Sequence, residues 1–338
     1  MNVVGLAVLA FLVTLVLTPL AIAVATRTGI MDRPGELKEQ TRPVPYLGGV
    51  AVLGGVLVAV LPDRASLALP MLAATVLGVA DDRFDLPPLV RVVGELAVGA
   101  LVVATSPVHL PGVVAAVGIV AVTLLLVNGV NLMDGLDMLA GGTVAVAGVG
   151  FAVLLAGAGR HLGVALAAAL LGFLVFNRPP ARIYLGDGGA YLLGTVLAVL
   201  VTQAWGPYEP TSTGVAAFAL VALPAAEVAF AVVRRLRGRT SLLAGDRGHP
   251  YDRLVARGWA RPSASAAYIA AQGVLTVGAV LAYRRSSLPL AVVVDVVGGL
   301  ALVVAAGVVG ALSPDSPDSP DSPDSPDSSD TTDQEIDP

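Results

Sequence analysis

The sequence predicts an all-α polytopic membrane protein with about 10–11 transmembrane helices and a polar site at one membrane face. Three properties predict this class. Hydrophobic residues make up 56% of the 338 residues, charged residues only 13%, and the mean hydropathy is +0.82. A soluble domain carries roughly twice this fraction of charged residues.

Eleven apolar segments are candidates to cross the bilayer. A hydrocarbon core about 30 Å thick requires ~20 apolar residues in each helix. Several of the segments are short, and 67–80 is the weakest. The segments are approximately 3–26, 46–62, 67–80, 91–106, 111–127, 141–158, 161–176, 188–205, 213–232, 263–283 and 288–312.

Composition divides the chain into a membrane domain, 1–312, and an acidic tail, 313–338. The tail is a Ser-Pro-Asp repeat that holds nine of the 25 acidic residues. Because it has almost nothing apolar to bury, we expect it to be disordered and to act only as a solvated spacer. The membrane domain alone then carries more basic than acidic residues.

Lys and Arg are distributed unevenly between alternate loops. With the N-terminus outside, sixteen of the 20 basic residues fall on one side, and the other side holds Arg64, Arg160, Arg284 and Arg285. Basic loops stay in the cytoplasm, so the crowded side is predicted to be cytoplasmic. A composition rich in Ala, Val, Gly and Arg, with a single Lys, is typical of a GC-rich bacterial genome. The expected location is therefore a bacterial plasma membrane.

Four polar clusters fall at the predicted cytoplasmic ends of the spans. Ionisable residues at membrane depth are costly and usually mark function, so four clusters on one side predict one shared site. They are DDRFDLPP (81–88), NGVNLMDGLD (128–137), NRPPARIYLGDGG (177–189) and GDRGHPYDRL (245–254).

The clusters supply hard oxygen ligands, because cysteine is absent and carboxylates dominate. Such ligands suit Mg²⁺, which binds through one or two carboxylates together with substrate phosphates. The Arg-rich loop from 234 to 261 would attract and hold phosphate. Together these features predict phosphoryl transfer from a soluble nucleotide to an acceptor in the membrane. No nucleic-acid partner is expected.

In order and spacing, the clusters resemble the motifs of the polyprenyl-phosphate N-acetylhexosamine-1-phosphate transferases, in glycosyltransferase family 4. That family moves a sugar-1-phosphate from a UDP-amino sugar to a lipid phosphate. The resemblance covers about residues 1–310. The DDxxD motif is matched by Asp81, Asp82 and Asp85. The NxxNxxDGxDG motif is matched by Asn128, Asn131, Asp134, Gly135 and Asp137, and the PAxxFxGDxGS motif by Pro180, Ala181, Gly186, Asp187 and Gly189.

Two loops depart from the motifs of this family. The first loop resembles DxPxxRKxHxxPxPxxGG through Asp32 and Lys38, but Gln40 stands where a His is usual. The loop near 250 keeps His249 and Arg253, whereas two further histidines of the motif are replaced. Their replacements are Tyr251 and Asp252.

The resemblance implies a role for each matched position. Asp187 would ligate Mg²⁺ (or Mn²⁺), with Asp82 as a second ligand, and Asp81 would be the general base. Asp134, Asp137 and His249 are further catalytic candidates. The expected substrate-binding residues are Lys38, Asn128, Asn131, Asn177, Arg247 and Arg253. The lipid phosphate would attack the donor directly, or a covalent aspartyl phosphate would form first; we expect direct attack.

The resemblance favours UDP-GlcNAc as donor and undecaprenyl or decaprenyl phosphate as acceptor, and a homodimer is a further expectation. A UDP-MurNAc-pentapeptide phosphotransferase is the alternative within the family, but its branch carries a more His-rich loop and a Lys where this chain has Asp85. A secondary transporter is the alternative from another class. It would hold its carboxylates near the bilayer midplane rather than at one face.

The series Asn128, Asn131, Asp134 and Asp137 has a spacing of three residues. A step of three residues turns an α-helix by about 300°, so the series would drift around the helix. One member could cap a helix end, but four are too many for capping alone. We therefore predict a break in the helix near Gly135.

Overall fold

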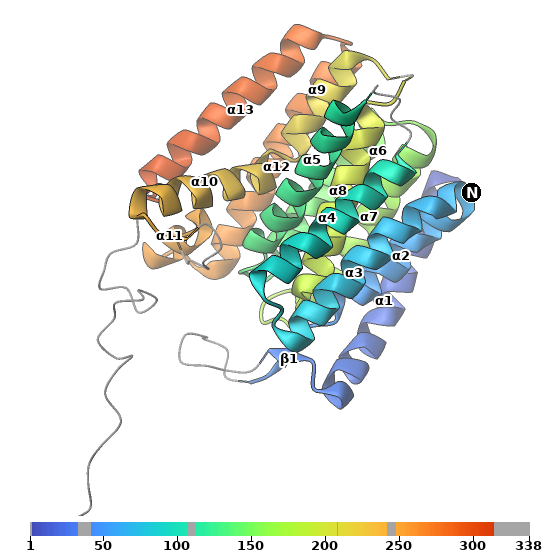
Figure 1. Cartoon of the computed structure of the whole chain (residues 1–338), viewed down its shortest axis with the longest axis vertical. Helices are drawn as coiled ribbons and strands as arrows, with labels where there is room; N and C mark the ends of the chain where they lie inside the picture. Colours follow the sequence, from blue (N-terminus) through green and yellow to red (C-terminus); the bar gives the residue numbers. More distant parts are fainter. Residues whose placement is uncertain (1, 33–41, 107–111, 208, 242–247, 314–338) are drawn as a thin grey trace, which may run out of the picture.

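The computed structural model describes residues 2–32, 42–106, 112–207, 209–241 and 248–313, and these ranges are almost entirely helical (Figure 1). The predicted tail, apart from Ser313, and the candidates Lys38 and Arg247 lie outside the described residues. The helices are α1 (Val3–Thr28), α2 (Gly48–Arg64), α3 (Ala68–Phe84), α4 (Pro88–Thr105), α5 (Val113–Met133), α6 (Leu139–Leu154), α7 (Gly157–Asn177), α8 (Gly186–Ala204), α9 (Thr211–Leu220), α10 (Ala222–Gly238), α11 (Pro250–Ala256), α12 (Arg261–Arg284) and α13 (Leu288–Val308). Strands β1 (Met31–Asp32) and β2 (Val44–Pro45) form a short antiparallel pair.

Within the described residues, eight helical segments are long and apolar enough to cross a membrane, or nine when α9 and α10, bent by 61°, count as one. One of the eight, Gly48–Phe84, is a hairpin. A Cβ on Gly49 would lie 2.2 Å from the Gly189 Cα, and one on Gly78 would lie 2.2 Å from the Asp187 carbonyl oxygen. Because both ends of the segment meet the start of α8, the segment folds back on itself, and its two 17-residue halves match two of the predicted spans. The 16-residue α6 matches the one remaining predicted span.

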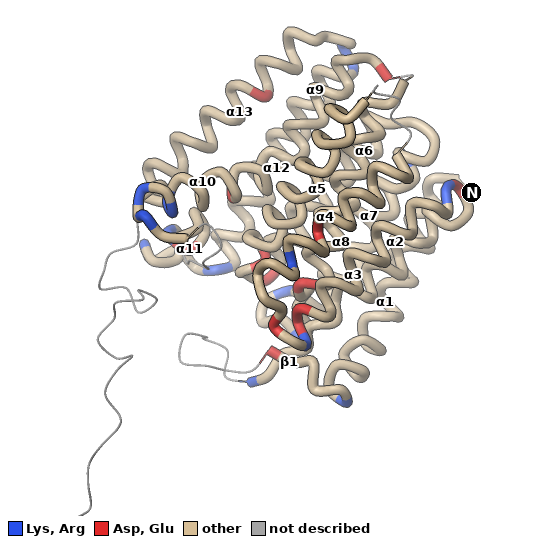
Figure 2. The backbone as a smooth tube through the Cα atoms, viewed as in Figure 1, with Lys and Arg blue, Asp and Glu red and all other residues tan. Residues whose placement is uncertain are grey.

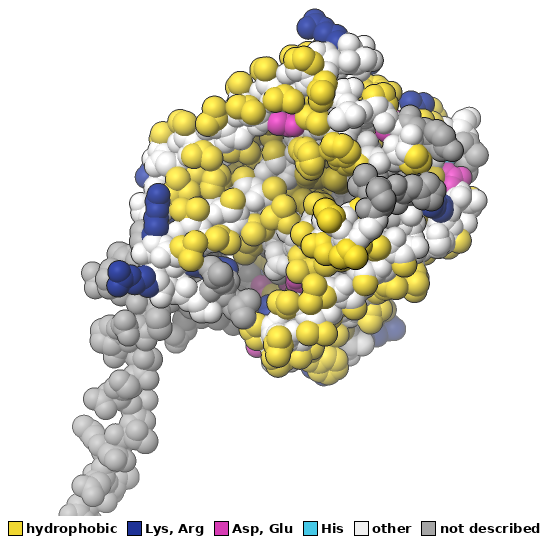
Figure 3. Space-filling view, turned by 45° about the horizontal axis from the view of Figure 1, so that its top comes forward, with side chains coloured by type: hydrophobic (Ala, Val, Ile, Leu, Met, Phe, Trp, Pro, Cys, Tyr) yellow, Lys and Arg dark blue, Asp and Glu magenta, His cyan; other side chains and the backbone are white. Residues whose placement is uncertain are grey.

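The predicted class is confirmed: the chain is an all-α, multi-pass membrane protein. α8 lies at its centre and packs against α2, α3 and α5. A helix surrounded by other helices can be apolar on every side, and nearly every side chain of α8 is buried. α13 lies at the edge (Figure 1) and exposes most of its valines and leucines, and apolar side chains cover most of the face seen in Figure 3.

The charged residues gather at one end of the helical bundle. Figure 2 shows acidic and basic positions concentrated near β1, the adjoining ends of α3 and α4, and α11, with few in the middle of the bundle. This distribution agrees with a polar site at one membrane face.

The helix break near Gly135 is confirmed. α5 ends at Met133, and the Asp134 N–H donates to the Asn131 carbonyl at 3.1 Å. Residues 134–138 form turns, Met138 has a φ of 66°, and α6 begins at Leu139. The polar series is therefore divided between the end of α5 and the turn that follows, which we call the 134–138 turn.

Candidate active site

The site is built around the start of α8. The Asp82 carboxylate, near the end of α3, accepts the Asp187 N–H through Oδ1 at 3.0 Å and the Gly188 N–H through Oδ2 at 3.2 Å. The first N–H groups of a helix have no partner within the helix, and its N-terminus favours a negative charge. Asp82 therefore joins two predicted clusters that lie about 100 residues apart in the sequence.

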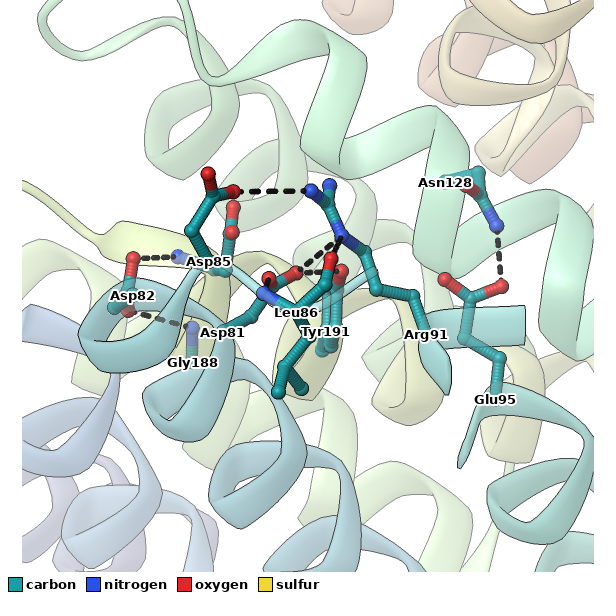
Figure 4. Close-up of polar contacts among 10 residues, drawn as sticks. Asp81, Asp82, Asp85, Leu86, Arg91, Glu95, Asn128, Gly188 and Tyr191 are labelled. Atoms are coloured by element: carbon teal, nitrogen blue, oxygen red, sulfur yellow. Dashed lines mark hydrogen bonds and ion pairs between the residues drawn. The ribbon is translucent and has the colours of Figure 1, made fainter. Parts of the chain in front are cut away.

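Asp81 holds α3, α4 and α8 together (Figure 4). Its Oδ1 accepts the Leu86 N–H at 3.0 Å, and its Oδ2 accepts the Tyr191 hydroxyl at 2.8 Å. The Arg91 Nε lies 3.1 Å from the same Oδ2, and only 4% of Asp81 is exposed. Both oxygens are thus engaged, which favours a positioning role for Asp81. Its assignment as general base stays a prediction.

Asn128 points away from the start of α8 and toward α4. Its Nδ2 donates to Glu95 Oε2 at 2.6 Å and to the Leu124 carbonyl at 3.0 Å (Figure 4). Glu95 is buried. Asn131, one turn further along α5, is half-buried. A substrate contact by Asn128 would therefore come from the side of the site next to α4.

The 134–138 turn brings Asp134 beside the carboxylates of the α3–α8 junction. Burial raises the pKa of Asp134 well above its ordinary value, and the charges of Asp187, Asp82 and Asp137 raise it further, against a hydrogen bond from the Gly186 backbone. Like charges disfavour ionisation of their neighbours. Carboxylates from three separate parts of the chain therefore share one electrostatic environment, as the sequence predicted.

Asp137 lies near the end of the same turn. Its Oδ2 accepts the Ala181 N–H at 3.0 Å, and its backbone carbonyl accepts the Ser265 hydroxyl at 2.8 Å. Burial raises the pKa of its carboxyl, while the Ala181 N–H and the nearby Arg261 charge lower it. Asp137 thus ties the turn to the loop after α7 and to the start of α12.

Asn177 is buried behind the site rather than facing it. Its Oδ1 accepts the Met138 N–H at 2.8 Å, and its Nδ2 donates to the Ile183 carbonyl at 3.0 Å. Both ends of the side-chain amide are therefore used to join the 134–138 turn to the loop before α8. The structure favours a positioning role for Asn177 over the substrate contact predicted from the sequence.

The β1–β2 pair and the residues next to it add groups that the sequence did not assign to the site. Asp32 is buried, hydrogen-bonds to the Tyr46 side chain and acts electrostatically on Asp82. Burial raises the pKa of Tyr46, and the hydrogen bond and charge of Asp32 raise it further. Burial and the Asp137 charge raise the pKa of Tyr184 to about 12. In the sequence, the match of Asp32 to the first-loop motif could have assigned this residue to the site.

His249 is buried in a hydrogen-bonded aromatic cluster. Its Nδ1 lies 2.8 Å from Glu227 Oε2, and the Tyr268 hydroxyl donates to Glu227 Oε1. The ring stacks on Tyr251, with 5.4 Å between centroids and 5° between planes. Glu227 therefore fixes the orientation of the imidazole. Arg253 lies on the same short helix, α11, and is half-buried.

The structure divides the predicted phosphate-binding arginines into two groups. Arg234 Nη1 donates to the Ala311 carbonyl and Arg237 Nη1 to the Leu312 carbonyl, both at 2.9 Å, and Arg257 donates to the Val309 carbonyl. Cations at a helix C-terminus satisfy its last carbonyls and its dipole. These three hold the end of α13, whereas Arg261 acts on the site through Asp137.

Asp295 lies apart from the site, in α13. It lines an apolar cavity of about 230 Å³ between α5, α9, α10, α12 and α13, and its Oδ1 has no hydrogen-bond partner. It does not contribute to the carboxylate cluster.

The carboxylate cluster presents the oxygen ligands that Mg²⁺ prefers. Asp187 and Asp82 present oxygen ligands, and Asp134 adds a third carboxyl group that interacts with both. Among the described residues, no group of three or more Asp, Glu or His side chains converges tightly enough to hold an ion unaided. Mg²⁺ keeps several waters and binds substrate phosphates, so one or two carboxylates suffice. The residues therefore fit the ion.

A family model and several known proteins are similar to this chain. A family model described as Glycosyl transferase family 4 matches residues 65–204. The chain is 31% identical over 283 residues, 68% of this chain and 70% of the relative, to a decaprenyl-phosphate N-acetylglucosaminephosphotransferase of Mycolicibacterium smegmatis.

Two further relatives carry closely related names. The chain is 29% identical over 276 residues to a Bacillus subtilis protein named "Probable undecaprenyl-phosphate N-acetylglucosaminyl 1-phosphate transferase", covering 74% of this chain and 76% of the relative. It is 28% identical over 299 residues to the undecaprenyl-phosphate alpha-N-acetylglucosaminyl 1-phosphate transferase of Escherichia coli, covering 78% and 81%. Fold, motifs and relatives agree, and the chain belongs to glycosyl transferase family 4.

Proposed function

We propose that this protein transfers N-acetylglucosamine-1-phosphate from UDP-GlcNAc to a polyprenyl phosphate, giving polyprenyl-diphosphate-GlcNAc and UMP. One observation carries the proposal. Asp82, Asp134 and Asp187 come from α3, from the 134–138 turn and from α8, and they act on one another electrostatically at one end of the bundle. Such a set is expected where a divalent ion meets a diphosphate. The names of the three relatives support N-acetylglucosamine as the sugar and a polyprenyl phosphate as the acceptor.

Asp187 and Asp82 would hold Mg²⁺, with Mn²⁺ as an alternative. When bound, the ion would supply positive charge next to the donor diphosphate. The backbone N–H groups of Asp187 and Gly188 orient the Asp82 carboxylate, so its direction is set by the start of α8. Tyr191, Arg91 and Leu86 hold Asp81 beside them.

We propose direct transfer. An oxygen of the lipid phosphate attacks the β-phosphorus of the UDP-sugar, and the bond from that phosphorus to the bridging oxygen breaks as the new bond forms. UMP leaves with the bonding electron pair. Asp81 and Asp82 already accept hydrogen bonds through both oxygens, which disfavours either as a covalent nucleophile. An aspartyl phosphate would instead let labelled UMP exchange into UDP-GlcNAc when no lipid acceptor is present.

The proposed location is the plasma membrane of a bacterium, with the site on the cytoplasmic side. The uneven distribution of Lys and Arg supports this orientation. UDP-sugars are soluble cytoplasmic donors, whereas the acceptor stays in the bilayer, so a site at the inner face can receive both. The homodimer expected from the sequence is a separate prediction that cross-linking in membranes would check.

The decisive assay uses the purified full chain, a polyprenyl phosphate, Mg²⁺ and a panel of UDP-sugars, with UMP and lipid-linked product measured together. We expect equal amounts of both from UDP-GlcNAc, little from UDP-MurNAc-pentapeptide, and nothing without the lipid. EDTA should abolish release and Mg²⁺ should restore it. Turnover that persists in EDTA would remove the metal from the proposal.

Two variants give the assay its internal comparison. Asp187→Asn removes the proposed ligand and should eliminate UMP release. Asp63→Asn changes a carboxylate near the far end of α2, paired with His161, and should leave UMP release unchanged. A transporter would instead accumulate UDP-sugar in proteoliposomes without releasing UMP, and that result would overturn the proposal.

A further inference from the structure

Tyr251 connects the short helix α11 to the 134–138 turn. Only 4% of it is exposed, and its hydroxyl donates to the Leu132 carbonyl at 2.8 Å. Leu132 is the penultimate residue of α5, where carbonyl groups have no partner within the helix. Tyr251, far along the sequence, therefore supplies a hydrogen bond to the end of α5, where the 134–138 turn starts.

The Tyr251 ring also lies directly against the turn. A Cβ on Gly135 would be 2.4 Å from the Tyr251 hydroxyl oxygen and 2.8 Å from its Cε2. Real Cβ atoms do not approach so closely, so a side chain at this position would require Tyr251 or the turn to shift. Tyr251 and Gly135 together set the distance between the turn and α11.

The same ring also packs on the site histidine. Tyr251 stacks on His249 at 5.4 Å with nearly parallel planes, and its edge meets Tyr268, with 6.0 Å between centroids and 74° between planes. Glu227 contacts both His249 and Tyr268. The ring thus contacts both the histidine and the turn that carries Asp134 and Asp137.

We propose that Tyr251 is a positioning residue that fixes the 134–138 turn relative to His249 and thereby determines the affinity for the UDP-sugar. The inference rests on the proposed function. The hydroxyl is essential to it, because the Leu132 carbonyl is held by that group. An imidazole, the side chain that the family motif has at this position, is shorter than a phenol and ends before that carbonyl. This chain therefore sets its turn by a contact that a histidine does not provide.

The experiment compares Tyr251→Phe and Tyr251→His with wild type, and uses Tyr283→Phe as the matched control. Tyr283 is half-buried near the C-terminal end of α12, whereas Arg261 near the site lies at its start. In Tyr251→Phe the KM for UDP-GlcNAc should rise about fivefold, the change expected for a net loss of ~1 kcal/mol. The KM for polyprenyl phosphate should stay near the wild-type value, and the melting temperature should fall only slightly, because one hydrogen bond is lost. Tyr251→His should raise the KM for UDP-GlcNAc at least as much, and the Tyr283 control should match wild type.

A second measurement does not depend on turnover. Hydrogen exchange in the peptide covering residues 132–138 should be faster in Tyr251→Phe than in wild type, because the end of α5 loses its external partner. Gly135→Ala should also raise the KM for UDP-GlcNAc. Adding Tyr251→Phe to Gly135→Ala should then cost less than the two single changes together, since both act on one contact.

The outcomes separate this inference from the proposed function. Unchanged KM values and unchanged exchange in Tyr251→Phe would overturn the inference while wild-type turnover stands. A lower melting temperature with an unchanged KM would also overturn it, because Tyr251 would then serve packing alone. A wild-type protein that releases no UMP from any UDP-sugar would refute the proposed function, and the exchange measurement would still test the contact with Leu132.

Discussion

The Asp82 carboxylate and the Asp187 backbone are joined at the start of α8, with 3.0 Å between Asp82 Oδ1 and the Asp187 nitrogen. One carboxylate thus caps the helix that presents the other. The contact orients the start of α8. The same two residues are the proposed Mg²⁺ ligands, so the geometry of the ion site and the start of α8 depend on each other.

Asp82→Asn separates the charge of this residue from its shape. An amide keeps one acceptor oxygen but turns an NH₂ group toward the Gly188 N–H, so one capping hydrogen bond is lost at a cost of ~1 kcal/mol. The Mg²⁺ concentration for half-maximal UMP release should rise at least about 10–100-fold. Titrating Mg²⁺ in the UMP assay measures this, with Asp63→Asn as the comparison. An unchanged Mg²⁺ requirement would remove Asp82 from the ion site.

The raised pKa of Asp134 predicts that, without divalent ions, the difference in stability between Asp134→Asn and wild type depends on pH. Its pKa is raised in the folded protein, so the folded state binds the proton more tightly than the unfolded state does. This contribution to stability is complete below the ordinary carboxyl pKa and is lost as pH rises through the raised value. The side chain of Asp134→Asn stays neutral. The melting temperature of this variant should therefore exceed that of wild type by an amount that grows as pH rises from about 5 to about 8 in EDTA. A constant difference across that range would contradict the assignment.

Asn177→Ala should destabilise the protein more than it affects substrate affinity. The change leaves the Met138 N–H and the Ile183 carbonyl without their partner, and an unsatisfied buried group costs roughly 1–3 kcal/mol. The melting temperature in detergent should therefore fall clearly. A raised KM for UDP-GlcNAc with an unchanged melting temperature would instead support the direct substrate contact predicted from the sequence.

The end of α13 and the acidic tail should behave differently when removed. Deleting residues 313–338 leaves the carbonyls of Ala311 and Leu312 in place, so UMP release and melting temperature should stay close to wild type. Deleting 306–338 removes the Ala311 carbonyl bound by Arg234, of which only 2% is exposed. Because this charge lies in a buried position, the longer deletion should lower the melting temperature. Equal behaviour of the two truncations would show that the arginine contacts contribute nothing.

Local patterns in the sequence were sufficient for much of the fold. Long apolar runs predicted the helices, and the drift of the series Asn128 to Asp137 predicted the break that α5 shows after Met133. The same patterns placed Asp82, Asp134 and Asp187 at one end of the bundle. These predictions succeeded because hydropathy, helical period and loop charge act over a few neighbouring residues.

Roles within the site were harder to predict. Asn177 and Asp187 both lie in one polar cluster of the sequence, yet Asn177 joins two loops while Asp187 opens α8. Similarly, Arg234 and Arg261 belong to one basic region of the sequence. Arg234 binds the end of α13, whereas Arg261 acts on Asp137. Nothing in the local sequence separates the members of either pair.

The sequence by itself determined that this chain crosses the membrane many times and carries its polar groups on one face, because those properties follow from the transfer energies of its segments. Only the tertiary structure decided which polar atoms meet. The close contacts of Gly49 with Gly189 and of Gly78 with Asp187 fix how α2, α3 and α8 are rotated against each other. That rotation, which no single helix encodes, directs Asp82 to the start of α8 and Asp81 to Tyr191.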